Sequence, residues 1–64
     1  MTLDEIFAHY GSFYRAAKTL DMSIQSFQNW KRSGFIPIVS QIKIEKFTKG
    51  TLKARLEDCI EMNN

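Results

Sequence analysis

The chain has 64 residues, of which 44% are hydrophobic and 25% charged, and its formal net charge is +2. A chain of this length is expected to form one domain over residues 1–64, with a core too small to be very stable without help. The single cysteine excludes an internal disulfide, the single histidine makes a structural zinc site untenable, and no apolar run approaches the roughly 20 residues of a membrane span.

The first two predicted helices have recognisable signals at their ends. Thr2 and Glu5 form a capping box in front of apolar positions 3, 6, 7 and 10, and Gly11 ends that helix. Ser12 can cap a second helix over residues 13–20, whose apolar positions 13, 16, 17 and 20 repeat the same spacing. Both patterns predict short amphipathic helices.

A tight turn at residues 21–23 leads into a third helix, from residue 24 to about residue 32. Ser23 is its expected N-cap, and Gly34 stops it. Phe27 and Trp30 define the core side of this helix. The opposite side carries three neutral amides and one arginine, namely Gln25, Gln28, Asn29 and Arg32.

The last part of the chain allows two interpretations. Pro37 suits the first turn of a fourth helix, with positions 38, 39, 42 and 47 facing inward and Gly50 ending it. Thr51 can then cap a fifth helix with an apolar stripe at positions 52, 56, 59 and 60. Polar and apolar residues also alternate over residues 41–47, before Lys49-Gly50, which fits a β-hairpin. We expect an all-α bundle of about five short helices, with three helices followed by a hairpin as the alternative.

Residues 13–32 have the layout of a helix-turn-helix. Its two helices cross closely, which requires a small residue such as Ala17 and large apolar residues around the crossing, here at positions 20, 22, 27 and 30. The turn usually has glycine because the backbone takes a positive φ there. Asp21 occupies that place, and aspartate tolerates this conformation better than most residues do.

Charge and side-chain chemistry point to DNA. Basic residues gather in the middle of the sequence and acidic residues at its ends, which suits a surface laid on phosphates, although ordinary solvated lysines give the same pattern. Glutamine and asparagine can pair bidentately with adenine, and arginine with guanine. We therefore expect base contacts from Gln25, Gln28, Asn29 and Arg32, and backbone contacts from Ser12, Arg15, Lys18, Ser23 and Lys31.

Residues 16–23, followed by Phe27 and Trp30-Lys31, resemble the phage Cro repressors, especially their all-helical branch. Residues 10–12, 36–37 and 44–50 resemble further segments of that family. The resemblance implies a repressor that binds a pseudo-palindromic operator as a dimer, with its third helix in the major groove. Phe13 departs from the family, which often has glutamine there on a phosphate, so Ser12 and Arg15 are expected to replace that contact.

The expected partners are double-stranded operator DNA and a second copy, as a weak homodimer or a dimer formed on DNA. Phe35, Ile36 and Ile38 either form the dimer contact or close the core. The alternatives are an antitoxin or activator, or a protein–protein adaptor without DNA binding. No catalytic motif occurs, so we expect no enzyme, cofactor, metal, membrane or small-molecule ligand. The acidic N-terminal segment does not resemble a signal peptide, which favours the cytoplasm for this bacterial or phage-encoded chain.

Overall fold

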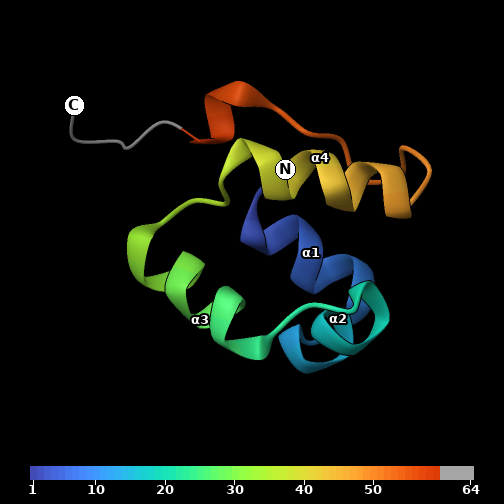
Figure 1. Cartoon of the computed structure of the whole chain (residues 1–64), viewed down its shortest axis with the longest axis vertical. Helices are drawn as coiled ribbons and strands as arrows, with labels where there is room; N and C mark the ends of the chain where they lie inside the picture. Colours follow the sequence, from blue (N-terminus) through green and yellow to red (C-terminus); the bar gives the residue numbers. More distant parts are fainter. Residues whose placement is uncertain (60–64) are drawn as a thin grey trace.

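The computed structural model describes residues 1–59, and no strand occurs among them. The prediction of an all-α fold is confirmed, and the hairpin alternative is wrong because residues 41–47 belong to a helix. The described residues form four α-helices and one short 3₁₀ helix (Figure 1): α1 (Leu3–Tyr10), α2 (Phe13–Leu20), α3 (Ile24–Ser33), α4 (Ile38–Phe47) and η1 (Leu56–Cys59).

Local capping explains why the first helices begin and end as predicted. The Glu5 amide donates to Thr2 Oγ1 at 3.2 Å and the Thr2 amide donates to Glu5 Oε1 at 2.9 Å, which completes the capping box of α1. Gly11 ends α1 with a φ of 85°. Ser12 Oγ then accepts from the Arg15 amide at 3.1 Å and caps α2.

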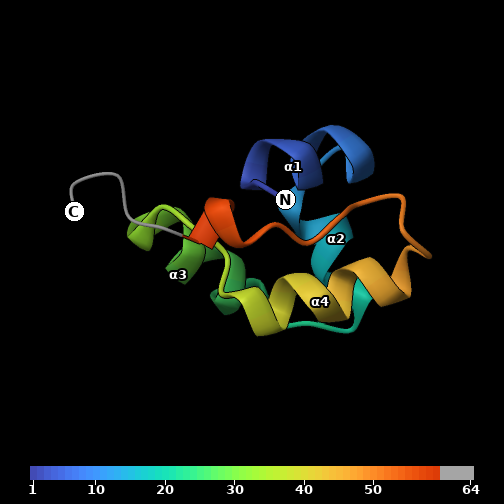
Figure 2. The ribbon, with the colours of Figure 1, turned by 90° about the horizontal axis from the view of Figure 1, so that it is seen from above.

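The helices enclose one core. The helix α2 packs against both α1 and α3, and the view of Figure 2 shows α1 and α4 on opposite sides of the molecule. The aromatic centre of the core is Phe27, stacked on Phe13 with ring centroids 5.8 Å apart, with the Trp30 ring edge-on at 4.9 Å. The remaining buried apolar side chains come from all parts of the described chain: Met1, Ile6, Ala16, Ala17, Leu20, Ile36, Ile44 and Leu52.

The inward face of α4 differs from the prediction. Val39 is 76% exposed, Ile42 44% and Phe47 54%, so three of the four apolar side chains expected in the core face solvent. The buried positions are instead Ile44 and the polar Gln41, both fully inaccessible. Apolar residues occur all around this helix, so periodicity alone could not select the side that packs inward.

The predicted fifth helix is wrong. Residues 50–55 run back beside α4 without helical structure, and up to residue 59 only η1, of four residues, follows (Figure 2). Leu52 is buried as expected, but Leu56 is 68% exposed, and Ile60 lies outside the described residues. Side chains of α4 hold this segment, because Glu45 Oε1 accepts from the Ala54 amide at 2.6 Å and Gln41 Oε1 accepts from the Arg55 amide at 2.9 Å. These contacts satisfy backbone amides that a helix would otherwise pair internally.

The Gln41 amide ties four segments together. Its Oε1 also accepts from the Met1 ammonium at 2.6 Å, and its Nε2 donates to the Ile36 carbonyl and to Cys59 Sγ, each at 2.8 Å. The Met1 ammonium additionally forms an ion pair with Asp58 at 3.0 Å. The side chain of Gln41 is therefore fully hydrogen-bonded although it is fully buried, which is the condition for a polar group to be tolerated in a core.

We expect Gln41→Met to lower the free energy of unfolding by on the order of 3 kcal/mol, because methionine has a similar shape but leaves buried donors and acceptors without partners. Urea unfolding followed by circular dichroism measures the change. Lys43→Met, at an exposed position of the same helix, is the matched control and should change stability by less than about 0.5 kcal/mol. Equal midpoints for the two variants would show that the Gln41 network does not stabilise the fold.

Candidate nucleic-acid interface

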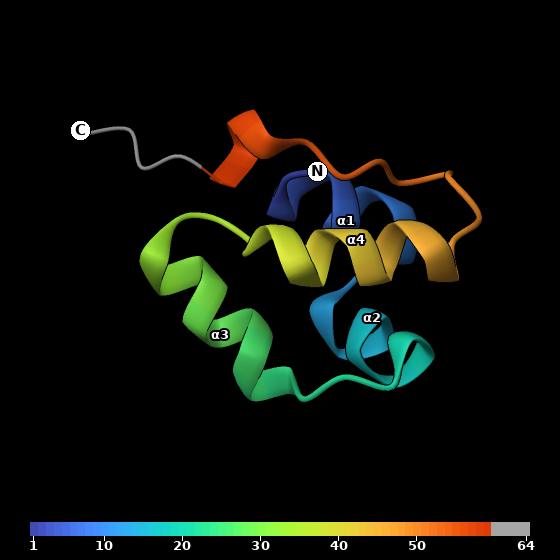
Figure 3. The same ribbon diagram turned by 45° about the horizontal axis from the view of Figure 1, so that its top comes forward.

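The α2–turn–α3 unit has the geometry of a helix-turn-helix. Asp21 has φ 56° and ψ 46°, so the predicted left-handed turn residue is confirmed. The Met22 amide donates to the Ala17 carbonyl at 2.8 Å and closes the end of α2. Ala17 is 4% exposed, and its small side chain allows the two helices to cross closely. Figure 3 shows α2 and α3 joined by this turn, with α3 along one edge of the molecule.

The two sides of α3 differ sharply. Phe27 is fully buried and Trp30 is 8% exposed, so the core side was predicted correctly. The other side carries exposed polar residues: Gln25, Gln28, Asn29 and Arg32. A surface helix with amides and an arginine on its free side can present bidentate hydrogen-bonding groups to the edges of base pairs.

The N-terminal part of this free side is organised by hydrogen bonds. Ser23 Oγ accepts from the Gln25 amide at 3.1 Å, as expected for the N-cap of α3. One turn along the helix, Gln25 Nε2 donates to Asn29 Oδ1 at 3.2 Å. The structure thus brings together two of the predicted base-contacting side chains.

The side chains expected to contact the DNA backbone come from both helices. Arg15 and Lys18 of α2 are exposed, and Ser12, half-buried, uses its Oγ as an acceptor for the cap of α2. Its hydroxyl hydrogen remains free to donate to an anion. Lys31 of α3 extends to the start of α2, where its Nζ lies 5.6 Å from the Phe13 ring centroid. A cation therefore lies beside Phe13 at the start of α2.

The comparison with protein families agrees with this geometry. The sequence model of the family described as "DNA-binding transcriptional regulator Cro" matches residues 2–63. The chain belongs to the Cro family. No curated protein and no solved structure matches it. The resemblance found in the sequence is thereby confirmed, and this Cro family member is a DNA-binding transcriptional regulator.

The sequence interpretation missed one exposed aromatic side chain near the start of α2. Tyr14 is 62% exposed, and the Nζ of Lys18, one turn later, lies 5.3 Å from its ring centroid. The periodicity of α2 contains the signal, since Tyr14 falls outside the apolar side formed by positions 13, 16, 17 and 20. Ile24, at the first position of α3, is 40% exposed and can offer an apolar contact beside Gln25.

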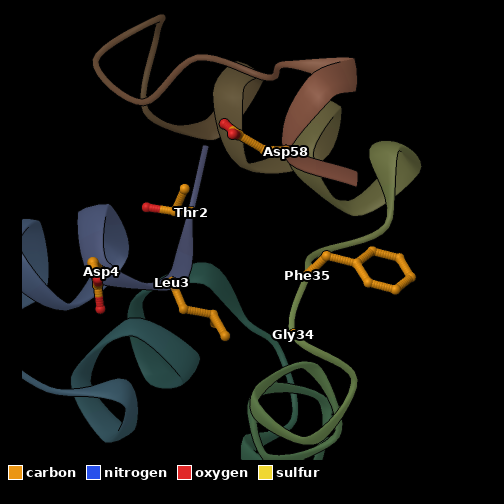
Figure 4. Close-up of a pocket in the computed structure, with 6 residues that line it drawn as sticks. All are labelled: Thr2, Leu3, Asp4, Gly34, Phe35 and Asp58. Atoms are coloured by element: carbon orange, nitrogen blue, oxygen red, sulfur yellow. The ribbon is translucent and has the colours of Figure 1, made fainter. Parts of the chain in front are cut away.

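A hollow of about 240 Å³ lies where the start of α1, the loop after α3 and η1 meet (Figure 4). It is lined by Thr2, Leu3, Asp4, Gly34, Phe35 and Asp58, none of which this Cro family member was predicted to use on DNA. The Asp58 carboxylate is already paired with the Met1 ammonium. Within residues 1–59, no three potential metal ligands gather at one place, and no helix is long and apolar enough to cross a membrane.

Proposed function

We propose that this Cro family member is a transcriptional repressor that binds a pseudo-palindromic operator as a dimer, with α3 in the major groove. The observation that carries the proposal is the division of α3, with Phe27 and Trp30 in the core and the four polar side chains exposed on the other side. In helix-turn-helix domains the second helix lies in the groove and its N-terminal residues contact base edges. Gln25 and Gln28 occupy that end of α3.

The proposed backbone contacts divide between the two helices. Arg15 and Lys18 project from α2, and Lys31 reaches back from α3 to the Phe13 ring. Cations on both sides of the turn would hold phosphates of the groove walls and fix the register of α3 on the duplex. They supply affinity without selecting a sequence, whereas the amides of α3 select the sequence.

Salt dependence separates the two roles. We expect Lys31→Ala to weaken binding to all duplexes alike and to make the slope of log affinity against log salt shallower by about 1 unit. Gln28→Ala is the matched control at an exposed position of the same helix, and it should leave the slope nearly unchanged. Fluorescence anisotropy with one labelled duplex at several salt concentrations measures both. Binding by the wild-type chain that is independent of salt would contradict the proposed interface.

The proposed dimer contact lies just after α3. Ile36 is fully buried, so this member of the predicted contact surface closes the core instead. Phe35 and Ile38 are half-buried and Val39 is 76% exposed, which leaves an apolar surface at the loop and the first turn of α4. We propose that a second copy covers these three residues. A contact at this place leaves the polar side of α3 free for DNA in both copies.

The dimer predicts a footprint of two half-sites whose centres are about 34 Å apart, one turn of the duplex. Sedimentation of the complex should give two chains per operator, and Val39→Lys should give one chain at the same protein concentration, because a buried lysine opposes the contact. Lys46→Ala, at an exposed position nearer the other end of α4, should retain two chains. A single asymmetric half-site protected at saturation would refute the dimer.

A further inference from the structure

The hydrogen bond between Gln25 and Asn29 bears on how α3 selects a sequence. Gln25 Nε2 donates to Asn29 Oδ1 at 3.2 Å, and both side chains are exposed on the side of α3 opposite Phe27. The backbone of Gln25 is fixed separately, because its amide donates to Ser23 Oγ at 3.1 Å. Ser23 therefore fixes the backbone of Gln25, and Asn29, one turn along α3, holds its side chain.

The bonded Gln25 side chain keeps the groups that an adenine requires. Its amide nitrogen has two hydrogens, of which one is given to Asn29, and its Oε1 is not the atom that makes this bond. The second hydrogen can be donated to adenine N7 while Oε1 accepts from the adenine amino group. Gln25 can thus pair bidentately with adenine without leaving Asn29.

Asn29 is placed differently. Its Oδ1 points along the helix to Gln25. To pair bidentately with an adenine of its own, Asn29 would have to bring Oδ1 and Nδ2 together to one base edge while Oδ1 still accepts from Gln25 with its other lone pair. The contact to Gln25 therefore restricts the directions in which Asn29 can present its own amide to a base.

We propose that Asn29 is a positioning residue, which fixes the amide of Gln25 for one base pair and selects no base pair of its own. The inference rests on the proposed function, in which α3 lies in the major groove. A glutamine side chain that is ordered before binding loses less conformational freedom when it meets the base. Since an amide pair one turn apart changes helix stability only slightly, the effect is expected in DNA recognition and not in folding.

A double-mutant cycle with Gln25→Ala, Asn29→Ala and the double variant tests this proposal. Each protein is titrated with the preferred operator and with duplexes altered at one base pair at a time. We expect Gln25→Ala to reduce discrimination at one base pair by on the order of tenfold. Asn29→Ala should reduce discrimination at that same base pair. The double variant should discriminate as well as Gln25→Ala alone, because Asn29 acts only through Gln25 and has no effect once Gln25 is removed.

Two further variants sharpen the test. Gln28→Ala combined with Asn29→Ala should show effects that multiply, since no bond joins these two side chains in the proposal. Asn29→Asp retains an acceptor oxygen for Gln25, so it should keep the base-pair preference while its added charge weakens binding to every duplex. Thermal unfolding of Asn29→Ala should match that of the wild type.

The outcomes distinguish this inference from the proposed function. If Asn29→Ala relaxes a different base pair, or leaves the preference at the Gln25 base pair intact, Asn29 does not position Gln25 and the inference is overturned while α3 remains the reading helix. If no alanine variant of α3 changes preference at any base pair although all still bind duplex DNA, the proposed function fails, and the inference fails with it.

Discussion

Trp30→Ala is expected to unfold the domain. Trp30 is 8% exposed and its ring meets Phe27 edge-on, with centroids 4.9 Å apart, at the centre of the core. Truncating a buried tryptophan costs about 3–5 kcal/mol through lost burial and the cavity left behind. A folded protein with a chain of 64 residues has a total stability of roughly 3–10 kcal/mol, so the loss removes a large part of it.

Circular dichroism during thermal unfolding measures this effect, with Gln28→Ala on the exposed side of the same helix as the control that should melt like the wild type. Loss of DNA binding by Trp30→Ala should accompany loss of helical signal. A Trp30→Ala protein that melts like the wild type yet fails to bind DNA would show that the tryptophan contacts DNA and that the assignment of the two sides of α3 is wrong.

The first three helices could be predicted because the information that sets them is local. Thr2, Ser12 and Ser23 each accept from a backbone amide two or three residues later, and Gly11 and Gly34 end helices with positive φ. Each of these signals acts within one helical turn, so a sequence pattern reveals it. The core sides of α2 and α3 followed from helical periodicity for the same reason.

The segment after α4, residues 50–55, could not be predicted because contacts with residues distant in the sequence determine its structure. The amide hydrogen bonds of Ala54 and Arg55 go to Glu45 and Gln41 of α4, and the Lys53 carbonyl accepts from the Met1 ammonium at 2.8 Å. Hydrogen bonds between residues so far apart in the sequence produce no periodic pattern of apolar and polar residues. The helical spacing of positions 52, 56, 59 and 60 therefore indicated a fifth helix that the tertiary contacts exclude from residues 50–55.

In the candidate site, too, local patterns could be predicted from the sequence and contacts between side chains could not. Exposure of the polar side of α3 followed from its periodicity, but the bond between Gln25 and Asn29 depends on side-chain conformation. The approach of Lys31 to Phe13 depends on how α3 crosses the start of α2. Sequence therefore predicted which residues face outward, whereas the structure shows which of them act together.

The most direct measurement for the central claim is selection of preferred sequences from random duplexes, with the wild-type chain and with the variant Gln25→Ala/Gln28→Ala. Both glutamines lie exposed at the N-terminal end of α3, where helix-turn-helix domains contact base edges. Each bidentate contact contributes about 1–3 kcal/mol of discrimination, so the double variant should lose preference by roughly 30-fold or more and at two positions in each half-site. It should still bind duplex DNA with the wild-type dependence on salt, because the cations of α2 and α3 are unchanged. If the variant selects the same sequence as the wild type, α3 does not select the sequence, and the proposed operator recognition is contradicted.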